Sequence, residues 1–397
     1  MIRSVVVEMR PRLQVCNVFI ITDEYLKQDE YVRINIKTSV VEVTWQSGTC
    51  EIIQVINLHD YKLRPLSLSA LRVLKKSISF RIQTEPAVSV VGSFASEVLP
   101  IKQSSEMIES TTVKLLAPCI RTDRPCQLAC KCCGKVMSKH DTLFTRVLPL
   151  PSSASWEISD WFCHQHTGSS CMQHSVLAPK ETDCLYGTCY ILVSASVMNV
   201  RNKQVVRCNR CLAWLGTRIN LTALKLWNCT MSYEGNNNST ALEDFICTVK
   251  QAFNKSCIMN CRLLLETKLS EEHSHYLLLW VMDKSLDLLV GADEDISHME
   301  ESAGKVVLEC KLRVKRTMKL LYMYCKDCDN MVKTWQDDCN VECVEVAKPM
   351  FTEGLAYLLR GTEFIPGPYK LTDSFLVTYL GLWRASYKIL ILCFRAS

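Results

Sequence analysis

The first 125 residues are dominated by short runs of β-branched residues in which apolar and polar positions often alternate. In Arg33–Lys37 the two kinds of residue alternate strictly, which places every second side chain on one face of a strand. The pattern predicts a β-rich N-terminal domain over residues 1–125, folded as an antiparallel sheet or a small sandwich. Its strands are expected at Val5–Val7, Gln14–Ile21, Tyr31–Trp45, Cys50–Asn57 and Ser77–Thr84.

The clearest helical pattern begins at a capping box, in which the Thr240 hydroxyl and the Glu243 carboxylate each accept a hydrogen bond from the other's backbone N–H. A single apolar stripe at helical spacing follows it. One interpretation is that this stripe packs on the core; the alternative is an exposed stripe that docks a partner. The residues of the stripe are Leu242, Phe245, Ile246, Val249 and Phe253.

The remaining pattern completes an α+β fold of three parts and a tail. The parts are the β-rich domain 1–125, a cysteine- and histidine-rich zinc-binding region 126–235, an α+β region 236–380 and an atypical tail 381–397. The proline-containing segment Leu148–Ser153 is expected to be a stiff, extended connector. Further helices are expected at Trp156–Phe162 and at Glu353–Arg360 between Pro349 and Gly361, and further strands at Arg262–Glu266, Tyr276–Met282, Lys305–Arg313 and Lys319–Tyr324.

Composition narrows the class of protein. The 397 residues are 48% apolar and 22% charged, which is typical of a globular chain. The net charge of +5 is too small for this length to indicate a nucleic-acid-binding protein by electrostatics alone. We find no run of 18 uncharged apolar residues that would span a membrane. Neither nucleic acid nor membrane is therefore expected as a direct partner.

The unusual feature of the composition is its 23 cysteines. The N-terminal residues contain neither an apolar signal core nor a small-residue cleavage site. Most of the thiols are therefore expected to be reduced, with a subset bound to metal. The cytoplasm is the expected compartment, with the nucleus as a second candidate.

Two Cys-x-x-Cys units are candidate zinc ligands. Cys130 and Cys133 precede Gly134, and the second unit is Cys208 and Cys211. Two such knuckles can form a tetrahedral thiolate cage, and a closed four-thiolate site would be structural because it has no open position for substrate. The 74 residues between the knuckles exceed the usual spacing, so buried free thiols are the alternative.

Cys163 and His164 follow Trp161 in a second chemically suggestive segment. The thiol could be packed beneath the neighbouring aromatic residues, be reactive or insert into a partner, or bind a metal. A reactive thiolate needs a lowered pKa, which the positive charge of a nearby imidazolium would favour. Two interpretations remain for the C-terminal cysteines: a second zinc site, or a mixture of core and surface thiols. These residues are Cys325, Cys328, Cys339 and Cys343.

Several segments in order resemble the HECT-like ubiquitin-protein ligases that bind ubiquitin-conjugating enzymes. The resemblance extends from about residue 126 to about 380 and is most specific between 130 and 216. The tail beyond Leu380 is unlike the family. The matching segments are Cys130-x-x-Cys133-Gly134, Arg146–Ser152 with Trp156, Trp161-x-Cys163-His164, Asp183-Cys184-x-x-Gly187, Cys208-x-x-Cys211 with Leu215-Gly216, Leu277–Trp280 and Lys319–Tyr322.

The resemblance implies a ubiquitin-protein ligase that accepts ubiquitin from a conjugating enzyme through a cysteine thioester. It also implies that the segment matching residues 240–260 docks the conjugating enzyme. The segment containing Cys163 has a second association in the family, which is to block the active site of the metal-dependent endonuclease of mRNA 3′-end processing. A non-enzymatic inhibitor or chaperone of that endonuclease is the alternative function. The thioester-cysteine pattern of classical HECT ligases is not recognisable here.

Overall fold

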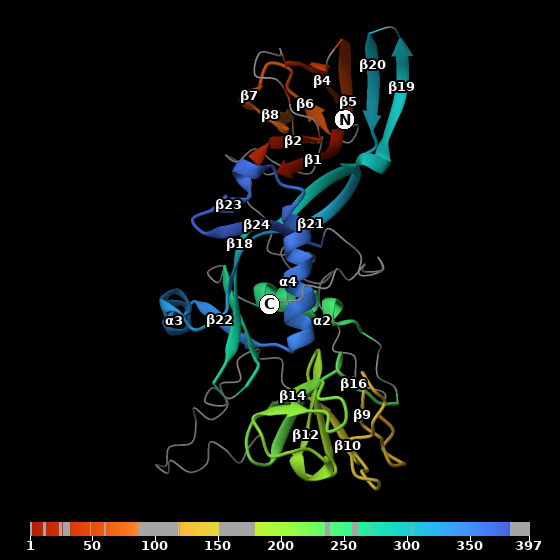
Figure 1. The fold of residues 1–397 in the computed structure, drawn as a ribbon, viewed down its shortest axis with the longest axis vertical. Coiled ribbons are helices and arrows are strands. Elements are labelled where there is room, and N and C mark those ends of the chain that lie inside the picture. The colour runs from red at the N-terminus through yellow and green to blue at the C-terminus, as the bar shows by residue number, and fades with distance from the viewer. Residues whose placement is uncertain are drawn as a thin grey trace. The chain divides into compact units, whose positions relative to one another are not determined.

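The computed structural model is β-rich with a few helices, which confirms the α+β class (Figure 1). It describes residues 2–10, 13–23, 26, 32–47, 49–58, 61–85, 118, 120–150, 179–234, 239–255, 261–270, 272–302 and 304–381. No helix in these ranges is both long and apolar enough to cross a membrane. The α-helices within them are α2 (Ala241–Lys255), α3 (Asn330–Asp337) and α4 (Lys348–Thr362).

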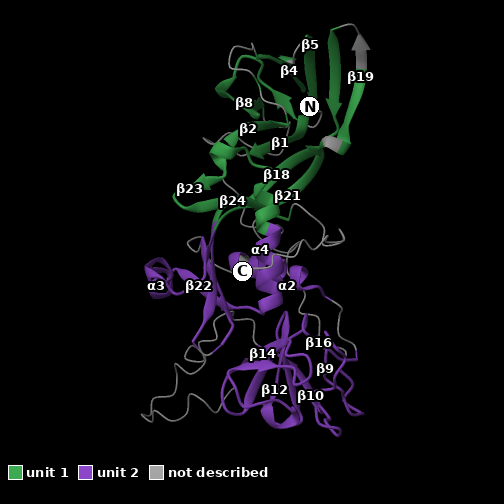
Figure 2. Ribbon diagram, in the orientation of Figure 1, with its two compact units in different colours: residues 1–106, 281–322, 358–384 green, residues 107–280, 323–357, 385–397 purple. Residues whose placement is uncertain are grey.

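The chain forms two compact units, and each draws on separate stretches of sequence (Figure 2). The first unit contains residues 1–106, 281–322 and 358–384, and the second contains 107–280, 323–357 and 385–397. These units do not coincide with the consecutive ranges expected from the sequence. Three elements are divided between them, namely β18 (Ser274–Ala292), β21 (Arg313–Cys325) and α4.

The first unit is built on antiparallel strands whose inward-facing residues are aliphatic. Val5 and Val7 are fully buried on β1, and Val18 and Ile20 are fully buried on the neighbouring β2. The strands are β1 (Ile2–Arg10), β2 (Val15–Thr22), β6 (Lys62–Leu63), β7 (Ser69–Leu74), β8 (Ser77–Glu85), β23 (Leu371–Thr372), β24 (Phe375–Leu380) and residues of β18 and β21.

A five-stranded sheet in the same unit has the order β19-β20-β5-β4-β3. The single strand expected at Tyr31–Trp45 is two strands, because the Lys37 N–H donates to the Val40 carbonyl across a tight turn. The sheet contains β3 (Arg33–Ile36), β4 (Val40–Ser47), β5 (Cys50–Asn57), β19 (Ile296–Ser302) and β20 (Lys305–Cys310).

The second unit contains a six-stranded sheet and a two-stranded one. In the larger sheet, β10 pairs with β11 in parallel, so the expected extended connector begins as a strand. Its order is β10 (Arg146–Pro149), β11 (Asp183–Tyr186), β12 (Tyr190–Ser194), β15 (Ala223–Trp227), β14 (Trp214–Arg218) and β13 (Val205–Arg207), and the smaller pair is β9 (Ala129–Cys130) with β16 (Met231–Ser232).

Helix α2 confirms the capping box. The Glu243 N–H donates to Thr240 Oγ1 at 3.1 Å, and the Thr240 N–H donates to Glu243 Oε2 at 2.9 Å. Four of the five stripe residues are at least 95% buried, and Ile246 is half-buried. A side chain on Gly354 of α4 would overlap the Phe245 ring, so this glycine allows the two helices to approach closely. The stripe therefore packs on the core of the second unit.

Several element ends differ from the expectation. Helix α4 begins before Pro349, which is tolerated in the first turn because its N–H would be unpaired there. Gly361 does not end the helix but lies inside it, where a Cβ would be 2.3 Å from Thr378 Oγ1. Strand β17 (Arg262–Lys268) begins where expected and ends two residues later than expected. Strands β18 and β21 are much longer than expected. The sequence pattern did not indicate α3 or β22 (Val341–Glu345). The helix expected at Trp156–Phe162 lies outside the described residues.

Candidate metal centre

The first Cys-x-x-Cys unit forms a tight knuckle that begins on β9. The Cys130 N–H donates to the Lys135 carbonyl at 2.9 Å, and the Gly134 N–H donates back to the Cys130 carbonyl at 2.8 Å. Gly134 has a φ of +70°, a left-handed conformation that glycine adopts without steric cost. The backbone N–H groups of Cys132 and Cys133 point at the Cys130 sulfur. This geometry is typical of a metal-binding knuckle.

The second Cys-x-x-Cys motif, Cys208 and Cys211, forms the same knuckle at the tip of the β13–β14 hairpin. The Cys208 N–H donates to the Ala213 carbonyl at 2.9 Å, and the Leu212 N–H donates to the Cys208 carbonyl at 3.0 Å. The Arg210 N–H lies 3.4 Å from Cys208 Sγ. Leu212 occupies the position equivalent to Gly134 and also has a positive φ, of 59°. The two knuckles therefore share one backbone conformation despite the 74 residues between them.

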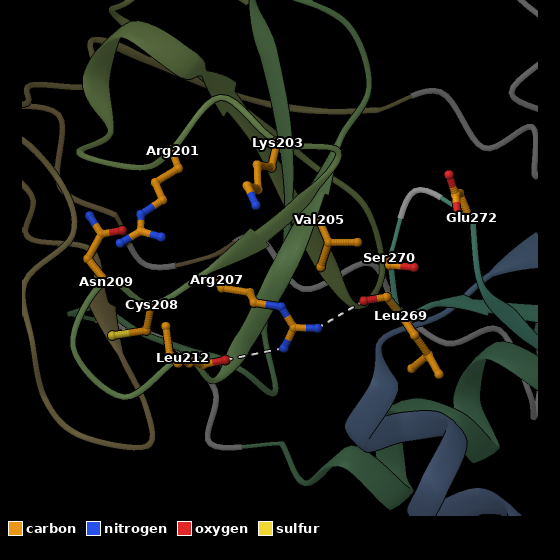
Figure 3. A pocket seen from close by; sticks show the side chains of 10 residues that line it. All are labelled: Arg201, Lys203, Val205, Arg207, Cys208, Asn209, Leu212, Leu269, Ser270 and Glu272. Atoms are coloured by element: carbon orange, nitrogen blue, oxygen red, sulfur yellow. Dashed lines mark hydrogen bonds between the residues drawn. The ribbon is translucent and has the colours of Figure 1, made fainter.

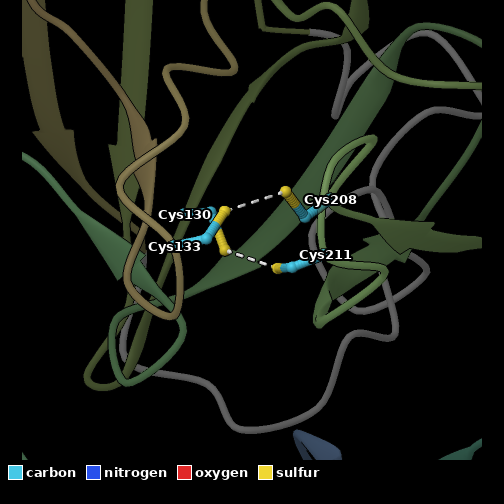
Figure 4. A group of neighbouring side chains, drawn as sticks. All are labelled: Cys130, Cys133, Cys208 and Cys211. Carbon is cyan, nitrogen blue, oxygen red and sulfur yellow. Dashed lines mark hydrogen bonds between the residues drawn. The ribbon is translucent and has the colours of Figure 1, made fainter.

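The four sulfurs converge, as the sequence predicts. Cys130 Sγ lies 3.7 Å from Cys211 Sγ, and Cys133 Sγ lies 3.6 Å from Cys208 Sγ (Figure 4). All four sulfurs are within 4.8 Å of one another. Zinc–sulfur bonds of about 2.3 Å in a tetrahedron place sulfurs about 3.8 Å apart. The donor set and its spacing therefore fit a tetrahedral metal ion.

Burial and hydrogen bonding act differently on the thiols of this cage. Cys130 and Cys208 are fully buried, Cys133 is half-buried and Cys211 is exposed. Burial raises the pKa of Cys130 to about 12. Burial also opposes ionisation of Cys208, but the N–H groups of Cys211 and Arg210, together with hydrogen bonds from the thiols of Cys133 and Cys211, outweigh it and lower that pKa to about 7. A bound cation would compensate for burying several thiolates together.

The shared knuckle conformation predicts opposite effects of two substitutions. We expect Gly134→Ala to lower the free energy of unfolding by about 1 kcal/mol, because an L-residue at positive φ is strained. No atom lies within 4 Å of the added Cβ, so the cost is conformational. Leu212→Gly is expected to relieve the same strain and to stabilise by a few tenths to about 1 kcal/mol. Urea unfolding of both variants measures the effects, and effects of the same sign would contradict the equivalence.

The other predicted site residues have different outcomes. Cys163 and His164 lie outside the described residues, so their reactive or endonuclease-inserting role stays a prediction. The sulfurs of Cys325, Cys328, Cys339 and Cys343 do not gather, since the four-cysteine cage is the one such group among the residues that the structure describes. Every described cysteine is a free thiol.

A thiol cluster that the sequence did not indicate lies beside α2. Cys189 is buried, and its thiol approaches the backbone carbonyl of Asp244 at 3.7 Å. A hydrogen bond between the thiols of Cys189 and Cys247, with burial, raises the pKa of Cys189 well above its usual value, and the same bond lowers the pKa of Cys247. Burial raises the pKa of Asp244 to about 6. These residues are 55 or more positions from Cys189 in sequence, so no local motif reveals the cluster.

A cavity of about 440 Å³ adjoins the second knuckle (Figure 3). Arg201, Lys203 and Arg207 line it, with Glu272 on the opposite side. Arg207 donates to the carbonyls of Leu212 at 3.3 Å and of Leu269 at 2.9 Å. Its guanidinium therefore ties the knuckle loop to the β17–β18 turn and is not free to hold a ligand.

Comparison with known proteins adds a family match. A family model described as HECT-like ubiquitin-conjugating enzyme (E2)-binding matches residues 8–377, which extends the resemblance into the N-terminal strands. The chain is 23% identical over 320 residues to an E3 ubiquitin-protein ligase of Homo sapiens, covering 70% of this chain and 78% of that protein. The identity to the Bos taurus ligase of the same name is 23% over 296 residues, covering 64% and 72%. No solved structure matches.

Proposed function

The chain belongs to the HECT-like ubiquitin-conjugating enzyme (E2)-binding family, and from this premise we propose that it is a ubiquitin-protein ligase. It accepts ubiquitin from a conjugating enzyme and transfers it to substrate proteins. The observation that carries the proposal is the extent of the match, because residues 8–377 include strands and helices of both units. A short shared motif alone would support a common metal knuckle and no more.

The chemistry of the proposal is two successive acyl transfers. A ligase thiolate attacks the thioester carbonyl of ubiquitin on the conjugating enzyme, a new thioester forms, and the thiolate of the conjugating enzyme leaves. A substrate lysine amine then attacks this thioester, an isopeptide bond forms and the ligase thiolate is released. We assign the acceptor thiol to Cys163, because His164 next to it in sequence can supply the positive charge that favours a thiolate.

Zinc is the ion that we propose for the four-cysteine cage. Four thiolates in tetrahedral spacing are a donor set that zinc prefers, and such a closed site is structural. Cys130 and Cys133 hold the ion from the β9 side, and Cys208 and Cys211 hold it from the β13–β14 hairpin. The cage thereby fixes these two parts of the second unit to each other.

Docking of the conjugating enzyme on residues 240–260 is also part of the proposal. The apolar stripe of α2 is largely buried, so its role in our proposal is to hold the helix in place. The residues of α2 that lie between the stripe positions would then contact the conjugating enzyme. Among these, Glu243 is exposed and Lys250 and Gln251 are half-exposed.

The thioester step makes a direct prediction for Cys163. Incubation of the full chain with a ubiquitin-charged conjugating enzyme is expected to give a ubiquitin adduct that reductant removes. Cys163→Ala is expected to abolish the adduct, whereas Cys163→Ser is expected to give a reductant-resistant ester. Non-reducing gel electrophoresis measures both. Cys132→Ala is the matched control, since Cys132 is exposed and lies outside the proposed metal cage.

Two negative results would have different meanings. An adduct that persists in Cys163→Ala would overturn the assignment of this cysteine but not the ligase, and Cys247→Ala would then be tested because the pKa of Cys247 is lowered. The absence of any adduct with the wild-type chain, together with no ubiquitin transfer to substrates, would overturn the proposed activity.

A further inference from the structure

A cavity of about 410 Å³ in the first unit lies against one face of the sheet that contains β1, β2 and β8. Alternate residues of a strand share a face, and the strand registers align the polar ones across the sheet. Asn17 is opposite Glu8 on one side and opposite Arg81 on the other, and Lys319 is opposite Tyr379. The strands that supply these residues are β1, β2, β8, β21 and β24, shown together in Figure 1.

These residues form a continuous hydrogen-bond network at the base of the cavity. Arg81 Nε donates to Asn17 Oδ1 at 3.0 Å, and Asn17 Nδ2 donates to Glu8 Oε2 at 3.0 Å. Lys319 Nζ and Tyr379 Oη both donate to Glu8 Oε1 at 2.5 Å. The Glu8 carboxylate is 1% exposed and has partners on both oxygens. Its negative charge is therefore already matched within the protein.

The cavity has a surplus of positive charge. Glu8 is the one carboxylate among its described lining residues, whereas Arg10, Arg72, Arg81 and Lys319 are cationic. Lys319 balances Glu8, which leaves three guanidinium groups. Arg10 Nε is buried and has no hydrogen-bond partner among the described residues, although another nitrogen of Arg10 lies 3.6 Å from Glu8. An acceptor oxygen on a ligand would remove the cost of this unsatisfied donor.

An aromatic wall closes one side of the cavity. The rings of Phe19 and Tyr369 pack edge to face with centroids 5.4 Å apart, and the Tyr369 hydroxyl lies 3.1 Å from Ser79 Oγ. The Arg72 guanidinium lies 5.7 Å from the centre of the Tyr369 ring. Strand β7 has a bulge between Ser69 and Arg72, and bulges commonly redirect side chains beside binding sites.

We propose that this cavity binds a small organic anion whose charged group, a phosphate or a carboxylate, lies among Arg10, Arg72 and Arg81. Guanidinium groups present paired donors that match the oxygens of both groups. The apolar part of the ligand contacts the wall formed by Phe19 and Tyr369. This site is separate from the proposed ligase chemistry, so either proposal can fail alone.

Titration calorimetry of the full chain at low ionic strength tests the site with four probes. Phenyl phosphate and benzoate carry each anionic group on a ring, inorganic phosphate lacks the ring, and benzylamine reverses the charge. We expect one ring-bearing anion to bind with one-to-one stoichiometry, and the tighter of the two identifies the charged group. Inorganic phosphate is expected to bind about tenfold more weakly, and benzylamine is expected not to bind.

Matched arginine variants locate the binding. Arg72→Gln and Arg81→Gln are each expected to weaken the better anion about tenfold. Arg64→Gln is the control, because Arg64 is exposed in the same unit and does not line the cavity, and its affinity is expected to be unchanged. Circular dichroism verifies that each variant is folded. Equal affinity of all three variants, equal binding of benzylamine, or no binding of either ring-bearing anion would overturn the proposal.

Discussion

Replacing Cys208 with serine is expected to abolish binding of the proposed zinc ion and to unfold much of the second compact unit. Cys208 is fully buried, and its sulfur lies 3.6 Å from that of Cys133. Structural zinc contributes on the order of 10 kcal/mol or more to the folding of small zinc domains. Loss of one of four ligands should therefore lower the free energy of unfolding by more than about 4 kcal/mol.

Elemental analysis and urea unfolding measure the two parts of this result. We expect one zinc per chain in the wild-type protein and none in Cys208→Ser. Cys132→Ser is the matched control, because Cys132 lies within the first knuckle but is exposed and outside the cage. It should keep the zinc and the wild-type stability. A zinc-free wild-type chain that is fully folded would contradict the proposed structural role of the metal.

Replacing Lys319 with methionine is expected to destabilise the first unit by about 3–5 kcal/mol, because the buried Glu8 carboxylate loses its nearest cation. Arg10 remains as a more distant cation, at 3.6 Å from Glu8. Lys319 Nζ is 2.5 Å from Glu8 Oε1. The double variant Glu8→Gln with Lys319→Met removes both charges and should recover much of the loss. Urea unfolding measures the three variants. A double variant no more stable than Lys319→Met alone would show that the loss does not come from the unpaired charge.

The same pair predicts opposite pH dependences. Burial alone would raise the pKa of Glu8, but the charge and hydrogen bond of Lys319, with Tyr379 and Asn17, lower it below its usual value. In the wild type this stabilisation is present above the unfolded pKa of about 4.3 and is lost as the pH falls through the lower folded value. In Lys319→Met, burial should raise the folded pKa, so stability should increase on acidification from neutral pH. Unfolding curves between about pH 7 and pH 2 measure both slopes, because the wild-type loss begins only near the unfolded pKa.

Features confined to a few neighbouring residues could be predicted. The capping box at Thr240 and Glu243 acts within one helical turn, and it forms as expected. Each Cys-x-x-Cys knuckle is likewise formed by residues close together in sequence. The two knuckles are predicted to share one ion because a zinc ion binds four thiolates. The structure brings these sulfurs together. The exposure of the α2 stripe was left open by the sequence, because a periodic pattern shows a shared face but not what covers it.

Element ends and long-range partners could not be predicted. The sequence predicts a helix end at Gly361, yet this residue lies inside α4, where any side chain would collide with Thr378. Glu8 could have been noticed as one acidic residue within the apolar strand β1. Its partners Lys319 and Tyr379 are 311 and 371 positions away, and no local pattern connects residues so far apart.

By itself, the sequence determined the α+β class, the helix at 241–253 and the family resemblance, and it predicted four convergent cysteines with free thiols as the alternative. These depend on local hydrogen bonding, side-chain periodicity and the chemistry of residue types. Only the tertiary structure decided that the α2 stripe is largely buried, that separate stretches of chain share each unit, and that Glu8 lies among cations in a cavity. The physical reason is that burial and electrostatic pairing depend on distances in space, which strand register and packing set between residues hundreds of positions apart.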